Sequence, residues 1–146
     1  MATFDFRLLR VRHLMTTRIK TLRENASIGR AQLEMREARI RHFPVVNAEG
    51  QLLGLVSDRD LYRAIGKGPL GKSQPVSEIM TTRMQTIQAD SPAFAAARLM
   101  RQLKVGMLPV VGQEDTLVGI ITETDFLEVA ETALRRHRVR PRKAPR

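Results

Sequence analysis

The chain repeats itself once, with a period of 65 residues. Residues 11–61 align with residues 76–126 without a gap, and 16 of these 51 pairs are identical. The identical pairs are spread along the whole unit and include Met15 with Met80, Pro44 with Pro109, Gly54 with Gly119 and Asp60 with Asp125. Self-similarity at a fixed period indicates one structural unit used twice. Two units favour a paired, closed domain over an open solenoid, so we expect ligand sites in pairs.

Both units show the same order of predicted elements. In the first unit we expect a short strand over residues 16–22, a helix over 28–38 capped by residues 25–27, strands over 40–46 and 52–56, and a helix ending at 65. In the second unit we expect a strand over 84–87, a helix opened by Pro92, strands over 107–111 and 116–121, and a helix over 123–135. Pro44 cannot donate a ladder hydrogen bond, so its strand is predicted to be short or at an edge. The predicted fold is α+β, with two β-α-β-β-α units related by a pseudo-twofold axis.

Composition divides the chain into five segments. Residues 1–10 are too apolar for a disordered leader, and the repeats are expected at 11–65 and 76–134. Residues 66–75 hold three glycines and two prolines, which predicts a linker. Residues 135–146 carry seven basic side chains, which predicts a basic, disordered tail.

The charge of the chain lies mainly in that tail. The net charge is +10, and removing the seven basic residues of 135–146 leaves 18 basic and 15 acidic residues, or +3. The body is therefore only mildly basic and gives no support for nucleic-acid binding. The tail itself suits either a solvated helix end or an electrostatic contact with nucleic acid or an acidic partner. The first interpretation is favoured, because the tail has no aromatic residue for stacking.

Several classes of protein are disfavoured by what the sequence lacks. There is no cysteine, and no apolar run approaches the roughly 20 residues of a membrane span. The three histidines, His13, His42 and His137, are scattered, and no phosphate-binding glycine motif is present. We therefore expect a cytoplasmic protein that is not an enzyme and needs no metal or cofactor.

A hydroxyl residue is followed three positions later by an acid at the end of each predicted hairpin. The pairs are Ser57 with Asp60 and Thr122 with Asp125. A helix N-terminus is a natural seat for a phosphate, and a carboxylate one turn into the helix can accept the hydroxyls of a ribose. The same spacing also forms a helix capping box, and the pattern alone favours that interpretation.

Two further positions are polar in the first unit. Arg41 and His42 precede Pro44, whereas Gly106 and Met107 precede Pro109. At the start of the first strand, the run Thr-Thr-Arg-Ile-Lys at 16–20 is matched by Thr-Thr-Arg-Met-Gln at 81–85.

Taken in order, these residues resemble the cystathionine-β-synthase (CBS) domain family, present as a tandem pair over about residues 11–130. The resemblance is carried by Met15-Thr16, the helix through Ala31, the runs HFPVV and MLPVV, the glycines 54 and 119, and the two hydroxyl–acid endings. It implies a sensor module that binds adenosine-containing ligands in clefts between the repeats.

The resemblance also assigns residues to these clefts. Asp60 and Asp125 would bind ribose, with Ser57 and Thr122 near the phosphate. The adenine pockets would use Ile19, Lys20, Arg41 and His42 from one repeat, and Met84, Gln85, Gly106 and Met107 from the other. One cleft would combine Thr122 and Asp125 with Ile19 and Lys20, and the other Ser57 and Asp60 with Met84 and Gln85.

Charge distinguishes the two sets. Lys20, Arg41, His42 and Arg59 are potential phosphate partners, whereas Gln85, Gly106, Met107 and Thr124 in the second repeat carry no charge. AMP, ADP or ATP should therefore prefer the cleft lined by the cations, over the cationic S-adenosylmethionine.

The resemblance further implies a stand-alone regulatory pair that forms a flat homodimer and signals to a separate, unidentified chain. A ligand would favour one orientation of the repeats by its differential affinity. Two alternatives stay open: a nucleic-acid-associated regulator acting through the tail, and a structural dimerisation module with empty clefts.

Overall fold

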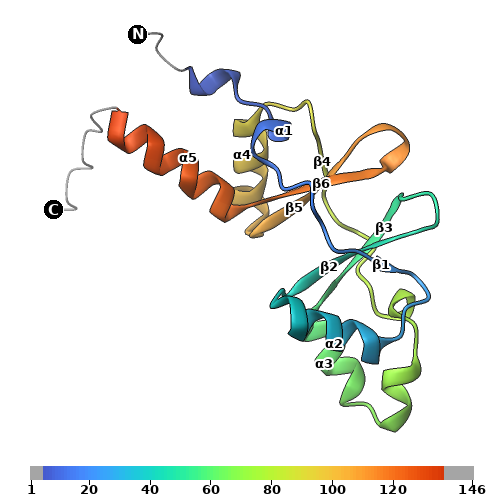
Figure 1. Ribbon diagram of the computed structural model, residues 1–146. Coiled ribbons are helices and arrows are strands. Elements are labelled where there is room, and N and C mark those ends of the chain that lie inside the picture. The colour runs from blue at the N-terminus through green and yellow to red at the C-terminus, as the bar shows by residue number, and fades with distance from the viewer. Residues whose placement is uncertain (1–4, 137–146) are drawn as a thin grey trace, which may run out of the picture.

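The computed structural model describes residues 5–136, and within them the chain forms two three-stranded sheets, each covered by helices (Figure 1). The first repeat contains β1 (Leu22–Arg23), α2 (Ile28–Ala38), β2 (His42–Val46), β3 (Leu52–Ser57) and α3 (Asp58–Ile65). The second contains β4 (Ile87–Gln88), α4 (Ala93–Leu103), β5 (Met107–Val111), β6 (Leu117–Thr122) and α5 (Glu123–Arg136). The predicted α+β class and the β-α-β-β-α order of both units are confirmed.

The strand that contains Pro44 was predicted to be short or at an edge; it is short, with five residues, but it is central in its sheet. β2 pairs with β1 in parallel and with β3 in antiparallel fashion, and residues 43–46 are buried. β1 pairs only with Val45 and Val46, so Pro44 lies beyond the end of this short strand. The missing N–H of the proline therefore costs no ladder bond on that side.

The strands predicted over residues 16–22 and 84–87 are much shorter than expected. Regular pairing is limited to β1 and β4, which have two residues each. The residues before them cross from one repeat to the other instead. Thr16 forms an isolated bridge with Ile120 of the second repeat, and Thr81 forms one with Leu55 of the first.

The repeats exchange the segments with which they begin. α1 (Val11–Leu14) packs on the second repeat, where Val11 is fully buried in the core and its N–H donates to the Ser91 carbonyl at 2.9 Å. Val76 is fully buried in the core of the first repeat, and its N–H donates to the Ala26 carbonyl at 2.8 Å. Each hydrophobic core is thus completed by residues from the other repeat.

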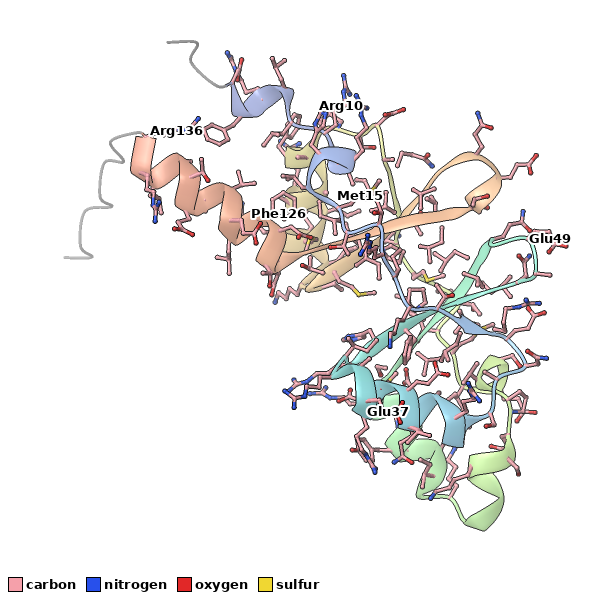
Figure 2. The ribbon with its side chains drawn as sticks, in the orientation of Figure 1. Arg10, Met15, Glu37, Glu49, Phe126 and Arg136 are labelled. Atoms are coloured by element: carbon pink, nitrogen blue, oxygen red, sulfur yellow. The ribbon has the colours of Figure 1, made fainter. Side chains whose placement is uncertain are left out.

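Each exchanged segment passes over a glycine of the opposite hairpin. A Cβ atom on Gly54 would lie 2.8 Å from the Met80 sulfur, and one on Gly119 would lie 2.7 Å from the Met15 sulfur. Real Cβ atoms do not approach so closely, so both positions require glycine. Figure 2 shows Met15 at this crossing, between the two sheets. The crossing explains why Gly54 is matched by Gly119, and Met15 by Met80, in the two repeats.

The segment predicted as a linker is folded. Residues 69–73 form a short 3₁₀ helix against α2 and α3, and the Ile28 N–H donates to the Gln74 carbonyl at 2.8 Å. The tips of the two hairpins also lie side by side (Figure 1): the Leu117 N–H donates to the Gly50 carbonyl, and the Gln51 side chain to the Glu114 carbonyl. These two hydrogen bonds between the hairpin tips join the two repeats.

The described residues end with the last helix. The predicted helix over 123–135 is confirmed as α5, which ends at Arg136. Residues 1–4, and the basic tail beyond Arg136, lie outside the described residues. Over residues 5–136, no helix combines the length and the apolar character that crossing a bilayer requires.

Candidate functional site

The pair Ser57 and Asp60 forms a capping box at the start of α3. The Asp60 Oδ2 atom accepts from the Ser57 N–H and from the Ser57 hydroxyl, both at 2.9 Å, and the Asp60 N–H donates to Ser57 Oγ at 3.2 Å. Both residues are half-buried. The capping interpretation is confirmed here, but it uses only one carboxylate oxygen: within residues 5–136, Asp60 Oδ1 accepts no hydrogen bond.

Thr122 and Asp125 repeat two of these three hydrogen bonds at the start of α5. The Asp125 Oδ2 atom accepts from the Thr122 N–H at 2.7 Å and from the Thr122 hydroxyl at 3.2 Å. The two acids therefore have the same structural role, and what differs is the surface around them.

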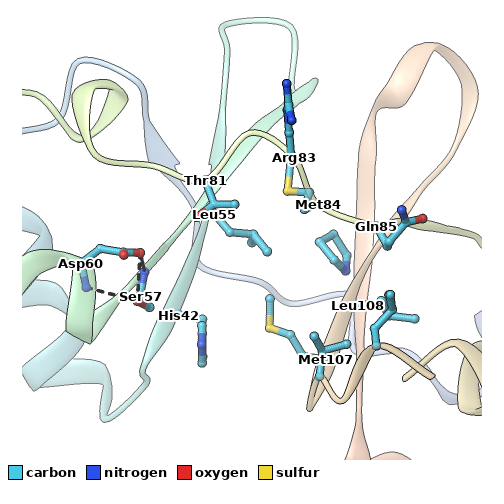
Figure 3. Close-up of a pocket in the computed structure, with 13 residues that line it drawn as sticks. His42, Leu55, Ser57, Asp60, Thr81, Arg83, Met84, Gln85, Met107 and Leu108 are labelled. Atoms are coloured by element: carbon cyan, nitrogen blue, oxygen red, sulfur yellow. Dashed lines mark hydrogen bonds between the residues drawn. The ribbon is translucent and has the colours of Figure 1, made fainter. Parts of the chain in front are cut away.

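A cavity of about 530 Å³ lies between the repeats beside Ser57 and Asp60 (Figure 3). Three parts of the chain line it. The first repeat contributes His42, Leu55, Ser57 and Asp60; the crossing segment contributes Thr81, Arg83, Met84 and Gln85; the second repeat contributes Leu103, Val105, Met107, Leu108 and Pro109. Its volume falls within the roughly 300–1,000 Å³ typical of small-molecule sites.

Six of the predicted site residues meet in this cavity: His42, Ser57, Asp60, Met84, Gln85 and Met107. The structure thus brings the acid motif of the first repeat next to the crossing segment of the second, which is the grouping that the sequence suggested. Figure 3 shows Ser57 and Asp60 on one side, and Met107 and Leu108 on the other.

The other eight predicted residues do not line this cavity: Ile19, Lys20, Arg41, Arg59, Gly106, Thr122, Thr124 and Asp125. Asp125 lines a separate pocket of about 280 Å³, together with His13 and Leu14 of the exchanged segment and Val129 of α5. Thr122 does not line that pocket, and neither do Ile19 and Lys20.

The four cations of the first repeat, Lys20, Arg41, His42 and Arg59, do not gather at this cavity. Of that set only His42 lines it. Arg41 lies in the bend before β2, and Arg59 is exposed on the first turn of α3.

Arg83 is the cation that the prediction missed. It lines the cavity from the crossing segment and is exposed. The duplicated Thr-Thr-Arg run was the available signal, but its pattern does not indicate which of the three side chains line a cavity, and here Thr81 and Arg83 do. Leu103, the last residue of α4, and Val105, two residues further on, also line the cavity and were not predicted as site residues.

The cavity has two chemically different sides. Ser57, Asp60 and His42 make the side of the first repeat polar, whereas Leu103, Val105 and Met107 make the side of the second repeat apolar. Arg83 and Gln85 lie on the crossing segment; Figure 3 shows Gln85 near Leu108, and the Arg83 side chain directed away from Ser57 and Asp60. A molecule with a flat apolar part and a polyhydroxyl or anionic part would match this division.

Comparison with known proteins identifies the family. The CBS domain family model matches residues 11–67 and 76–132. The chain belongs to the CBS domain family, as a tandem pair. It is 34% identical over 117 residues to the CBS domain-containing protein YhcV of Bacillus subtilis, covering 80% of this chain and 81% of that protein.

Other relatives are much longer. The chain is 37% identical over 116 residues to a homoserine O-acetyltransferase of Methanococcoides burtonii, which covers 80% of this chain but only 23% of that protein. The chain therefore spans about a quarter of this relative.

Solved structures share the fold. A putative acetoin utilization protein (AcuB) from Vibrio cholerae superposes with a TM-score of 0.79 and 36% identity, covering 88% of this chain and 94% of that one. CBSX2 in complex with AMP superposes with a TM-score of 0.76 and 26% identity, covering 86% of this chain and 98% of that one. The CBS domain pair of protein MJ0100, in complex with 5′-methylthioadenosine and S-adenosyl-L-methionine, has a TM-score of 0.73 and 26% identity. The match covers 86% of this chain and 98% of that one.

Proposed function

We propose that this CBS pair is a regulatory sensor that binds an adenosine-containing ligand in the cavity between its repeats. The observation that carries the proposal is the composition of the cavity wall: a half-buried carboxylate from one repeat faces an apolar wall from the other across about 530 Å³. The relatives crystallised with AMP and with S-adenosyl-L-methionine support this choice of ligand class.

Asp60 is the proposed ribose-binding residue. Its Oδ2 atom is already used by the capping box, so the position of the carboxylate is fixed before a ligand arrives. Its Oδ1 atom accepts no hydrogen bond within the described chain and is free to accept one from a ribose hydroxyl. A carboxylate is a strong acceptor, and one held in place loses little entropy on binding.

The base and the phosphate would occupy the two remaining parts of the cavity. Leu103, Val105 and Met107 offer the apolar surface that a planar base needs. Arg83 and His42 offer the positive or protonatable groups that a phosphate needs. Because both groups favour an anion, AMP, ADP or ATP remains the preferred ligand over a sulfonium nucleoside. The residues that support this preference differ from the four cations named in the sequence analysis: only His42 is common to both sets.

The proposed signal is a change in how the repeats face each other. The cavity lies within one chain, and residues of both repeats form its walls. A ligand that touches both walls stabilises the orientation in which it binds best, by its differential affinity for the two orientations. A separate protein would respond to that orientation. Use of cellular adenine nucleotides implies a cytoplasmic location, which is part of the same proposal.

Calorimetric titration of the full chain with AMP, ATP, adenosine and S-adenosylmethionine tests the ligand class. The matched pair Asp60→Asn and Asp125→Asn tests the residue, because both acids cap a helix in the same way. We expect Asp60→Asn to weaken AMP binding at least about tenfold, the value of one charge-assisted hydrogen bond. Asp125→Asn should bind AMP at the Asp60 cavity as the wild type does.

Two results would overturn the proposal. If none of the four ligands binds, the cavity is not an adenosine site, and the alternative of a purely structural module is favoured. If Asp125→Asn loses AMP binding while Asp60→Asn retains it, the ligand binds in another place.

A further inference from the structure

The cations of the folded body are distributed unevenly, and three of them form a row along one helix of the first repeat. Arg59, Arg63 and Lys67 follow one another at intervals of four residues, on α3 and on the turn after it, and all three are exposed. Residues four apart lie on the same face of a helix, about 6 Å apart along its axis. Arg63 and Lys67 also line one small pocket of about 220 Å³. These three residues define a basic stripe on α3.

The fold itself does not account for this stripe. Within residues 5–136, its three side chains form no ion pair, although the exposed acid Glu78 lines the pocket that Arg63 and Lys67 share. Arg59 stands on the first turn of α3, where the helix dipole disfavours a cation. Like charges four residues apart also repel each other. The stripe therefore lowers the stability of its own helix, and its positive charge is available to a partner.

The second repeat provides an internal comparison, because α5 is the counterpart of α3. The three positions of the stripe are occupied there by Thr124, Glu128 and Thr132. The basic stripe is thus a property of one repeat and not of the shared fold. None of its residues lines the cavity between the repeats, so the stripe has no part in the proposed ligand site.

An aromatic side chain stands beside the stripe. Tyr62 of α3 is 65% exposed, and it is the single tyrosine of a chain that has no tryptophan. It lines a groove between α2 and α3 together with Arg36, an exposed cation that is unpaired within the described residues. Asp58 lines this groove as well, and it accepts from the Arg59 N–H at 2.8 Å. The two helices lie side by side, at the end of the molecule away from α5 (Figure 1).

We propose that the basic stripe, together with Tyr62 and Arg36, binds a single-stranded nucleic acid. Phosphates lie along the row of cations, and an unpaired base stacks on the exposed ring of Tyr62. The ring favours a nucleic acid over an acidic polypeptide, because carboxylates gain nothing from stacking. It favours a single strand over a duplex, because the stacked base must be free of its neighbours. This surface belongs to the folded body and is distinct from the basic tail.

Intrinsic fluorescence tests the proposal directly, because all tyrosine emission of the chain comes from Tyr62. The full chain is titrated at low salt with a single-stranded oligothymidylate, with N-acetyltyrosinamide as the reference for light absorbed by the bases. We expect emission to fall and to reach a plateau as the ring is stacked. Inorganic polyphosphate should compete with the oligonucleotide without quenching the ring. Polyglutamate that binds as tightly as the oligonucleotide would indicate an acidic protein partner and would overturn the proposal.

Two matched double variants test the stripe. Arg59→Ala/Arg63→Ala removes two of its cations, and Arg98→Ala/Arg101→Ala removes two exposed cations from α4. All four side chains are exposed, so the fold should be retained, and thermal melts check this. A phosphate contact to a single strand contributes about 0.7 to the slope of log binding constant against log salt. The first variant should therefore reduce this slope by about 1.4, and the second should leave it unchanged. Tyr62→Ala should weaken binding about tenfold.

Four results would count against this surface. If the chain does not bind the oligonucleotide, there is no such site. If both double variants lose the same affinity, the binding reflects overall charge, including that of the tail. If the strand binds while the tyrosine emission stays unchanged, Tyr62 is not in contact with a base. If acrylamide does not quench Tyr62 in the free chain, another molecule, such as a second copy of the chain, covers this face.

Discussion

Replacing Gly54 by alanine tests the crossing that joins the two repeats. The added Cβ would lie 2.8 Å from the Met80 sulfur, 2.9 Å from Met80 Cγ and 2.9 Å from the Thr81 carbonyl oxygen. The Met80 side chain can move, but the Thr81 carbonyl cannot move freely, because it accepts from the Leu55 N–H at 3.0 Å. Alanine therefore disturbs both the Met80 packing and this backbone hydrogen bond.

The size of the effect follows from these two costs. Overpacking a buried position costs about 1–3 kcal/mol, and a backbone hydrogen bond contributes about 1 kcal/mol. We therefore expect Gly54→Ala to destabilise the chain by about 2–4 kcal/mol. At about 2–4 °C per kcal/mol for a chain of this size, the melting temperature should fall by about 4–16 °C.

Urea denaturation and thermal melts measure this loss, with Gly66→Ala as the control. Gly66 has a φ of −64°, and its added Cβ would lie 3.4 Å from the nearest atom, so alanine should be neutral or stabilising there. In the Gly54→Ala/Met80→Ala double variant, only the clash with the methionine disappears. The Gly54→Ala step should therefore cost less on the Met80→Ala background than in the wild type. If Gly54→Ala melts like Gly66→Ala, the segment does not pass over Gly54 as described.

Three further changes probe the cavity and the exchange. Arg83→Ala should weaken AMP binding about tenfold and leave adenosine binding unchanged, whereas its repeat equivalent Arg18→Ala should change neither; equal losses for AMP and adenosine would exclude a phosphate contact. Val76→Ala should cost about 1–3 kcal/mol and speed amide hydrogen exchange in the first repeat, whereas Val11→Ala should do so in the second; the opposite pattern would contradict the exchange. Ser27→Ala removes the oxygen that caps α2 at Arg30 N–H, so it should lower stability by about 1 kcal/mol in urea; an unchanged midpoint would show that the cap contributes nothing.

The regular elements of the fold were predictable because each depends on local patterns. Apolar spacing gave α2 and α4, and the turn residues 47–50 gave the first hairpin, where the Asn47 side chain accepts from the Glu49 and Gln51 N–H groups. The short extent of the first strands and the folded structure within the linker were not predicted, for a different reason. Their backbone partners lie in the other repeat or on neighbouring helices, and a pattern read along one segment contains no information about them.

The residues that lie together in the candidate site were predictable, but the charged side chains that line it were not. The family resemblance grouped Asp60 with Met84 and Gln85, and these residues line one cavity. Which cations face that cavity depends on how the crossing segment is oriented, and this is set by its contacts with the opposite hairpin. Arg83 and Arg41 therefore could not be ranked from composition.

The exchange of leading segments has a consequence for how such a chain arose. Half of it, encoded alone, would expose the slot that Val76 fills and would carry Val11 with no slot of its own to enter. Two copies of that half could satisfy one another by trading these ends, as partners in a swapped dimer. Fusion of two such halves would make this association unimolecular, and would let each half carry different side chains at equivalent positions, such as His42 and Met107.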